Sequence, residues 1–84
     1  MEAERQHAKK ASPLTLLEIL ARQPQKSLPL FNLQEQSGME PTRYGEALIN
    51  LRNAGYLEFK GEGFDGVIWL TPSGEEVVRL ARPA

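Results

Sequence analysis

The chain has 84 residues and no cysteine; ten lysines and arginines against eleven carboxylates give a formal net charge of −1. One domain of this length hides only about 60–65% of its unfolded surface on folding, and the lack of cysteine excludes disulfides and thiolate metal ligands. The balanced charge argues against strong sequence-independent DNA binding, because that affinity comes mostly from basic groups near phosphates. We find neither a secretory signal nor an apolar run near the ~20 residues of a membrane span, so we expect a cytoplasmic protein.

The N-terminal part of the sequence predicts an arm followed by a helix. Residues 1–11 have almost no apolar content, which is typical of a disordered or frayed arm. Ser12 and Pro13 suit the N-cap and first position of a helix, and Pro24 ends it because proline disfavours helical geometry at Gln23. Apolar residues cover more of this helix than one core requires: Leu14, Leu16, Leu17, Ile19, Leu20 and Ala21. Deep burial and a second apolar edge facing a partner subunit both remain open as explanations.

The next elements are a short strand and a short helix joined to a turn. Lys26–Leu28 is a candidate edge strand, and Pro29 fits an edge rather than the interior of a sheet. Leu30–Ser37 follows as a short helix, which Gly38 ends because glycine adopts positive φ without strain. One apolar residue, Met39, is then expected to plug the turn before the following helix.

Residues 41–54, PTRYGEALINLRNA, predict the helix around which the chain is organised. Tyr44, Leu48 and Leu51 fall at i, i+4 and i+7 and therefore share one inward face. Gly55 suits the left-handed residue that closes a helix. The opposite face carries short polar or charged groups, which are suited to contact a base edge, a protein or water.

A β-hairpin and a last helix complete the chain. Tyr56–Lys60 and Val67–Leu70 are short apolar strands that flank the glycine-rich loop GEGFDG. Thr71 is a capping residue followed by proline, which predicts the start of a helix. The apolar side of this helix is expected to consist of Val77, Val78, Leu80 and Ala81.

Three segments carry a resemblance to a known family: GEALINLRNAGYLEF at 45–59, the glycine-rich wing at 61–66, and LTPSGEEVVRLA at 70–81. In this order the chain resembles the winged helix-turn-helix superfamily, nearest to small bacterial multiple-antibiotic-resistance-regulator-like and phenolic-acid-regulator-like repressors. The resemblance covers about residues 12–82. It implies an α+β fold with a three-helix core, a β-hairpin wing and a C-terminal helix, forming one domain over residues 12–84.

The resemblance also implies a function, that of a small transcriptional regulator that binds double-stranded DNA. Residues 41–54 would form the recognition helix in the major groove, where arginine pairs with guanine and asparagine with adenine. Few phosphate contacts are available to one chain, so a homodimer is implied. The candidate DNA-binding residues are Thr42, Arg43, Glu46, Asn50, Arg52 and Lys60.

The charge of the wing supports a second hypothesis. Between Glu58 and Asp65 one lysine stands against three carboxylates, for a net charge of −2 that repels phosphate. The alternative is therefore a winged-helix module that binds a protein partner without strong DNA binding. Its candidate contact residues are the aromatic side chains Phe31, Phe64 and Trp69.

Nothing in the sequence predicts catalysis, a cofactor or a metal. There is no cysteine nucleophile, and the single histidine, His7, lies in the N-terminal arm. The glycine-rich loop lacks the lysine and the strand-to-helix context of a phosphate-binding loop, and no metal-ligand spacing is present. We therefore expect a protein that is not an enzyme, binds no cofactor or metal, and has no membrane contact.

Overall fold

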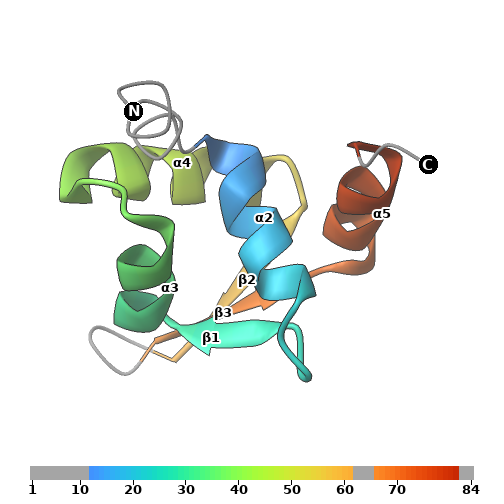
Figure 1. Ribbon diagram of the computed structural model, residues 1–84, viewed down its shortest axis with the longest axis horizontal. Helices are drawn as coiled ribbons and strands as arrows, with labels where there is room; N and C mark the ends of the chain where they lie inside the picture. Colours follow the sequence, from blue (N-terminus) through green and yellow to red (C-terminus); the bar gives the residue numbers. More distant parts are fainter. Residues whose placement is uncertain (1–11, 62–65, 82–84) are drawn as a thin grey trace, which may run out of the picture.

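The computed structural model describes residues 12–61 and 66–81, and within them the chain forms four helices and three strands (Figure 1). The predicted arm, Phe64 and the last three residues lie outside the described residues. The α+β class, with a helix–turn–helix followed by a hairpin and a last helix, is confirmed. The elements in chain order are α2 (Pro13–Ala21), β1 (Ser27–Pro29), α3 (Leu30–Ser37), α4 (Pro41–Asn53), β2 (Leu57–Lys60), β3 (Val67–Leu70) and α5 (Pro72–Ala81).

Helix α2 begins at the predicted residue and ends two residues early. At its start the backbone N–H of Ser12 donates to Thr15 Oγ1 at 3.1 Å. Its predicted end at Gln23 is wrong, because the chain tightens into a turn in which Gln23 N–H donates to Leu20 O at 3.0 Å. The ammonium of Lys26 then donates to Ala21 O at 2.9 Å and satisfies the last helical carbonyl.

The three strands form one antiparallel sheet in the order β1-β3-β2. Strand β1 is shifted by one residue from its predicted position, since Lys26 has a φ of 59° and cannot continue a strand. In the hairpin Leu57 pairs with Leu70 on the face that packs on the helices, and Glu58 pairs with Trp69 on the outer face. Pro29 lies in the edge strand as predicted, where a missing N–H leaves no gap in the ladder.

Helix α2 lies at the centre of the molecule, between α3 and α4 on one side and α5 on the other (Figure 1). It also contacts the sheet, so it is surrounded by other elements along its length. This arrangement explains why α2 is apolar around so much of its circumference, and it decides between the two explanations in favour of deep burial. The fully buried side chains of the core are Leu16, Leu17, Leu20, Leu33 and Ile68.

Helix α5 is fastened to the end of α4 through Thr71 and Gly74. The hydroxyl of Thr71 donates to Gly55 O at 2.7 Å and accepts from the N–H of Gly74 at 3.0 Å. Gly74 packs so closely that a Cβ there would lie 2.6 Å from Leu70 Cδ1 and closer still to the carbonyl oxygen of Tyr56. The Leu-Thr-Pro-x-Gly sequence is therefore a docking device for α5, and its glycine serves close approach rather than helix formation.

The predicted apolar side of α5 is only partly correct. Val78 is buried and Val77 is partly buried, but Leu80 is 73% exposed and Ala81 is exposed as well. The reason is the helical period: Leu80 lies two residues after Val78, which is about 200° around the helix. Leu80 therefore faces away from α2.

Candidate nucleic-acid interface

The turn between α3 and α4 is built from a left-handed residue and a serine. Gly38 has a φ of 72°, which any residue with a Cβ would adopt at a cost. The buried Ser37 hydroxyl donates to Gln34 O at 2.8 Å and accepts from the N–H of Met39 at 3.2 Å. Met39 is partly buried against the core, as predicted for the plug of this turn. These bonds fix the direction in which the chain enters α4.

Tyr44 then sets α4 against α3. Its hydroxyl donates to Leu30 O at 2.6 Å, and its ring is 4% exposed. Burial raises the pKa of Tyr44 to about 12, and a hydrogen bond with the Gln34 backbone opposes part of that rise. The buried phenol therefore acts as a neutral donor that holds the two helices of the motif together.

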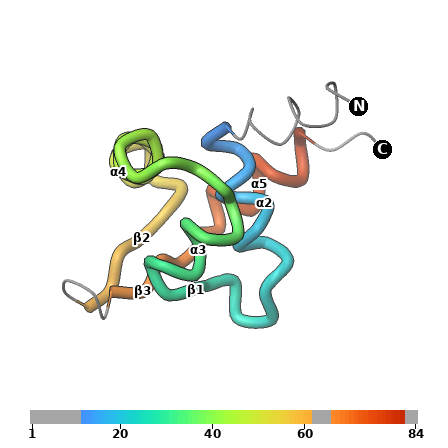
Figure 2. The backbone as a smooth tube through the Cα atoms, turned by 60° about the vertical axis from the view of Figure 1, so that its left-hand side comes forward, coloured from blue at the N-terminus to red at the C-terminus, as the bar shows by residue number. Residues whose placement is uncertain are grey.

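The residues predicted to contact DNA are all exposed. On α4 the buried side is formed by Tyr44, Ala47, Leu48 and Leu51, as the apolar spacing predicted. Figure 2 shows the hairpin of β2 and β3 extending on the same side of the molecule as α4. The outward side of α4 and the hairpin therefore lie on the same side of the molecule.

The cations of the predicted site do not all share one side of α4. Arg43 and Arg52 are nine residues apart, which places them about 180° apart around the helix at about 100° per residue. Arg43 lies on the same edge as Asn50, whereas Arg52 lies over the hairpin, 5.0 Å from the ring centroid of Phe59. Thr42 and Glu46 lie between these two edges, in the middle of the outward face.

The hairpin holds its own cation over an aromatic ring. Lys60 Nζ lies 5.2 Å from the centroid of Trp69 on the outer face of the sheet. Phe59 belongs to the inner face, yet it is 38% exposed, because it lies toward the loop end of the hairpin, under Arg52. Both cations are therefore positioned by rings, which reduces the side-chain entropy that they would lose on meeting a phosphate.

The aromatic residues of the alternative hypothesis are not gathered into one surface among the described residues. Phe31 is 50% exposed, whereas Trp69 is partly buried on the outer face of the sheet and covered by Lys60. Phe31 lines a hollow of about 480 Å³ on the surface of α3. The other described residues of that hollow are Gln34, Glu35, Gly38 and Met39.

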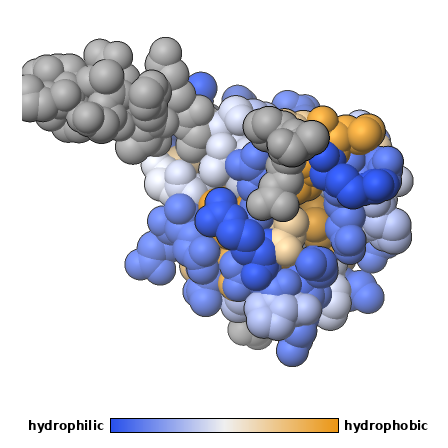
Figure 3. All heavy atoms as spheres, turned by 45° about the vertical axis from the view of Figure 1, so that its right-hand side comes forward, coloured by the Kyte–Doolittle hydropathy of each residue, from blue (hydrophilic) through white to orange (hydrophobic). Residues whose placement is uncertain are grey.

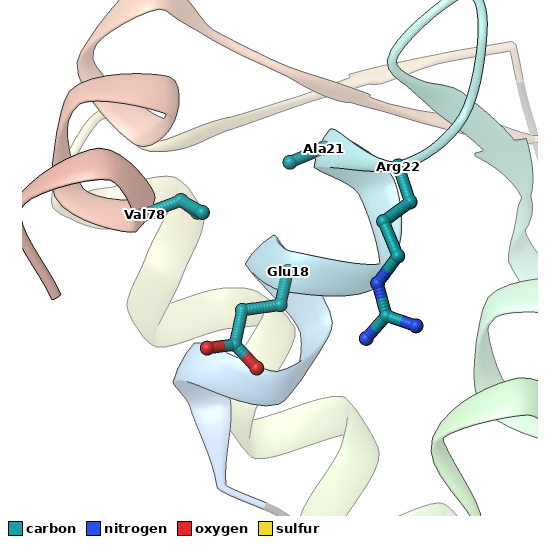
Figure 4. A pocket seen from close by; sticks show the side chains of 4 residues that line it. All are labelled: Glu18, Ala21, Arg22 and Val78. Carbon is teal, nitrogen blue, oxygen red and sulfur yellow. The ribbon is translucent and has the colours of Figure 1, made fainter. Parts of the chain in front are cut away.

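A second hollow, which the sequence did not predict, lies between α2 and α5 and measures about 220 Å³. Figure 3 shows this side of the molecule, where apolar residues surface among hydrophilic ones. Ala21 and Val78 point toward each other across the hollow, and the charged ends of Glu18 and Arg22 extend from its α2 side (Figure 4).

The sequence reasoning also missed Ile49. Its side chain is 49% exposed on the outward side of α4, among the residues predicted to contact DNA. The spacing already predicts that Ile49 is exposed. It lies five residues after Tyr44 and is therefore not among the inward-facing positions i, i+4 and i+7.

The described residues contain neither a candidate metal cluster nor a candidate membrane-spanning helix. No group of three or more histidine, aspartate or glutamate side chains gathers there as a metal site would require. No helix in the part of the chain that the structure describes is both long and apolar enough to cross a membrane.

Comparison with solved structures identifies the fold. A MarR family transcriptional regulator of Streptomyces coelicolor superposes with a TM-score of 0.74 at 22% identity, covering 82% of this chain and 49% of that one. A MarR family regulator of Silicibacter pomeroyi gives 0.73 at 22% identity, covering 86% and 49%. AbsC, a MarR family transcriptional regulator of S. coelicolor, gives 0.72 at 17% identity, covering 81% and 48%.

The chain therefore has the winged helix-turn-helix fold of these regulators, as the sequence predicted. It spans about half the length of the solved structures that it matches. No protein-family model matches the sequence, and a search of curated proteins gave no match. At identities of 22% and below the similarity shows the fold alone, because one fold serves many functions.

Proposed function

We propose that this domain binds double-stranded DNA through the outward side of α4 and acts as a transcriptional regulator. The observation that carries the proposal is the exposure of one side of α4. The opposite side of this helix is buried against the rest of the domain, and the exposed residues are Thr42, Arg43, Glu46 and Asn50. The solved structures with the same fold are described as transcriptional regulators, which agrees with this assignment.

The geometry of α4 suits the major groove. Its 13 residues span about 20 Å at 1.5 Å per residue, and the groove is about 12 Å wide and accepts a helix. In that position Arg43 would donate to the O6 and N7 atoms of guanine, and Asn50 would pair with adenine. Glu46 would accept from the amino group of cytosine.

The remaining cations would position the domain rather than select a sequence. Arg52 lies over Phe59 on the hairpin side of α4, and Lys60 lies over Trp69 on the outer face of the hairpin. Phosphate contacts fix the register of a protein on the duplex without distinguishing bases. We assign Arg52 and Lys60 to the phosphates that border the groove.

Two copies are required for useful affinity. The two phosphate contacts assigned to each domain give a slope of log K against log salt of about −1.8, and two domains give about −3.6. Raising salt from about 50 to about 200 mM would thus weaken a monomer about 12-fold and a dimer about 150-fold. The slope therefore measures how many copies bind.

The test is a titration of fluorescent random duplex at these two salt concentrations. We expect salt-dependent binding that Arg52→Ala weakens several-fold, because Arg52 is assigned to a phosphate, a contact that does not depend on the sequence of the duplex. Arg79→Ala is the matched control, because Arg79 is an exposed arginine of α5, where it pairs with Glu76. A folded chain that shows no duplex binding at low salt would refute the proposal, as would equal effects of the two substitutions.

A second candidate function is a module that binds a protein partner. The hollow of about 480 Å³ beside Phe31 on α3 favours it, as does the net acidic wing in the sequence. This hypothesis predicts that Phe31→Ala abolishes capture of a partner while thermal unfolding stays unchanged. Leu80→Ala, which truncates another exposed apolar side chain, should leave capture intact.

A further inference from the structure

Ile49 is an apolar side chain placed where polar groups were expected. It is 49% exposed, although isoleucine is normally buried. It contributes nothing to the core of α4, which is formed by Tyr44, Ala47, Leu48 and Leu51. Its exposure leaves the side chain available to a binding partner.

The position of Ile49 is central on the face that we assign to DNA. Thr42, Glu46, Ile49 and Asn53 are spaced by four, three and four residues, so they form one stripe opposite the buried side. Ile49 is the ninth of the 13 residues of α4, near the middle of its length. A helix lying along the major groove brings the middle of its outward stripe toward the base edges.

The chemistry of the groove offers one apolar target. Among the groups exposed on the four base pairs in the major groove, only the C5-methyl of thymine is apolar. If isoleucine packed on guanine, cytosine or adenine, the hydrogen-bonding groups of that base would lose their water molecules and gain no new hydrogen-bond partner, which costs free energy. An exposed isoleucine in the middle of a groove-facing stripe thus matches thymine and disfavours the other bases.

We propose that Ile49 is a specificity-determining residue that packs on the C5-methyl group of a thymine in the bound site. This inference rests on the proposed DNA binding and adds the base class that the centre of α4 selects. Arg43 and Asn50 lie on one edge of the helix and are left to pair with neighbouring bases, so the thymine falls next to their contacts.

Replacing thymine by deoxyuridine deletes the methyl group and changes nothing else in the groove. Duplexes of about 20 base pairs are first selected from a random pool with the wild-type protein at low salt. Each thymine of the selected site is then replaced in turn by deoxyuridine, and the affinity is measured by fluorescence anisotropy. We expect one position per half-site at which the loss is about fourfold, the value of one buried methyl group.

The same substitutions are repeated with protein variants to show that Ile49 is the partner. Ile49→Ala should bind several-fold more weakly and lose its response to deoxyuridine at that position only, because the methyl no longer has a contact to lose. Leu80→Ala is the control, since Leu80 is 73% exposed on α5 and should leave both the affinity and the response unchanged. Thermal unfolding of Ile49→Ala checks that the fold is retained.

Two results would overturn the inference and leave DNA binding standing. One is wild-type binding that no deoxyuridine substitution weakens; the other is an Ile49→Ala variant that keeps the full wild-type response. A chain that binds no duplex at low salt would instead overturn the inference together with the proposed function, so the two failures are distinguishable.

Discussion

Replacing Gly74 by alanine should destabilise the domain, although alanine is the better helix former. Gly74 is buried in the first turn of α5, where the helix docks on the chain leaving α4. The new methyl group would meet the carbonyl oxygen of Tyr56 and lie 2.6 Å from Leu70 Cδ1. The leucine can rotate, but the carbonyl is held in place by the N–H of Thr71 at 3.1 Å.

The size of the effect follows from three contributions to the free energy of unfolding. Overpacking of this kind costs about 1–3 kcal/mol. Moving α5 outward to relieve it would weaken the hydrogen bonds of Thr71 to Gly55 and Tyr56, each worth about 0.5–1.5 kcal/mol. Alanine returns about 1 kcal/mol through helix propensity. The net loss is about 3 kcal/mol, a large share of the total stability of a small domain.

Gly45 provides the matched control, because it is also a helical glycine. A Cβ added at Gly45 in α4 meets nothing within 4 Å. We therefore expect Gly45→Ala to stabilise the domain by about 0.8–1 kcal/mol. Urea denaturation measures both variants, and Gly74→Ala should also lower Tm by at least about 10 °C. If Gly74→Ala proves as stable as the wild type while Gly45→Ala behaves as expected, the docking argument is wrong.

Three further predictions concern the hydrogen bonds of Tyr44, Ser37 and Thr71, each measured by equilibrium denaturation. Because the native state holds the proton of Tyr44 up to a pKa of about 12, against about 10 when unfolded, the stability should be full below pH 10 and fall by up to about 2–3 kcal/mol as pH approaches 12. In Tyr44→Phe that dependence should disappear. Ser37→Ala should cost about 1–2 kcal/mol, because the N–H of Met39 loses its acceptor; an unchanged stability would contradict its role in the turn. Thr71→Val, which removes the bond to Gly55 and the cap of α5, should cost about 1–2 kcal/mol, and a loss below about 0.5 kcal/mol would argue against the clamp.

Local rules of sequence predicted most of the fold. Helix α4 was placed to within one residue, because apolar spacing defines its inward face and Gly55 closes it with a φ of 88°. The start of α2 followed from its serine and proline. The end of α2 and the register of β1 could not be predicted, since both depend on the bond from Lys26 to Ala21 and on pairing with β3, which is distant in the sequence.

The sequence proposed the residues of the candidate site, and the structure supplies their arrangement. The helical period places Arg43 and Arg52 on opposite edges of α4 and places Ile49 on its outward side. Both features can therefore be predicted from the sequence by assigning every residue of the helix to a face. The position of Arg52 over Phe59 was not available, because it needs the direction in which β2 leaves α4. The same holds for Lys60 over Trp69, which requires the register of the hairpin.

The strand order has a consequence for how the domain is made. Strand β3 pairs with β1, which precedes the helix–turn–helix, and with β2, which follows it. Both ends of the segment that carries α3 and α4 are therefore paired with β3, which is synthesised later than either helix. Pairing across this distance must await the distant strand, so the sheet that joins the two ends of this segment is complete only after Leu70 has been synthesised. A nascent chain that stops before Val67 contains the complete helix–turn–helix sequence without the strand that pairs with both β1 and β2.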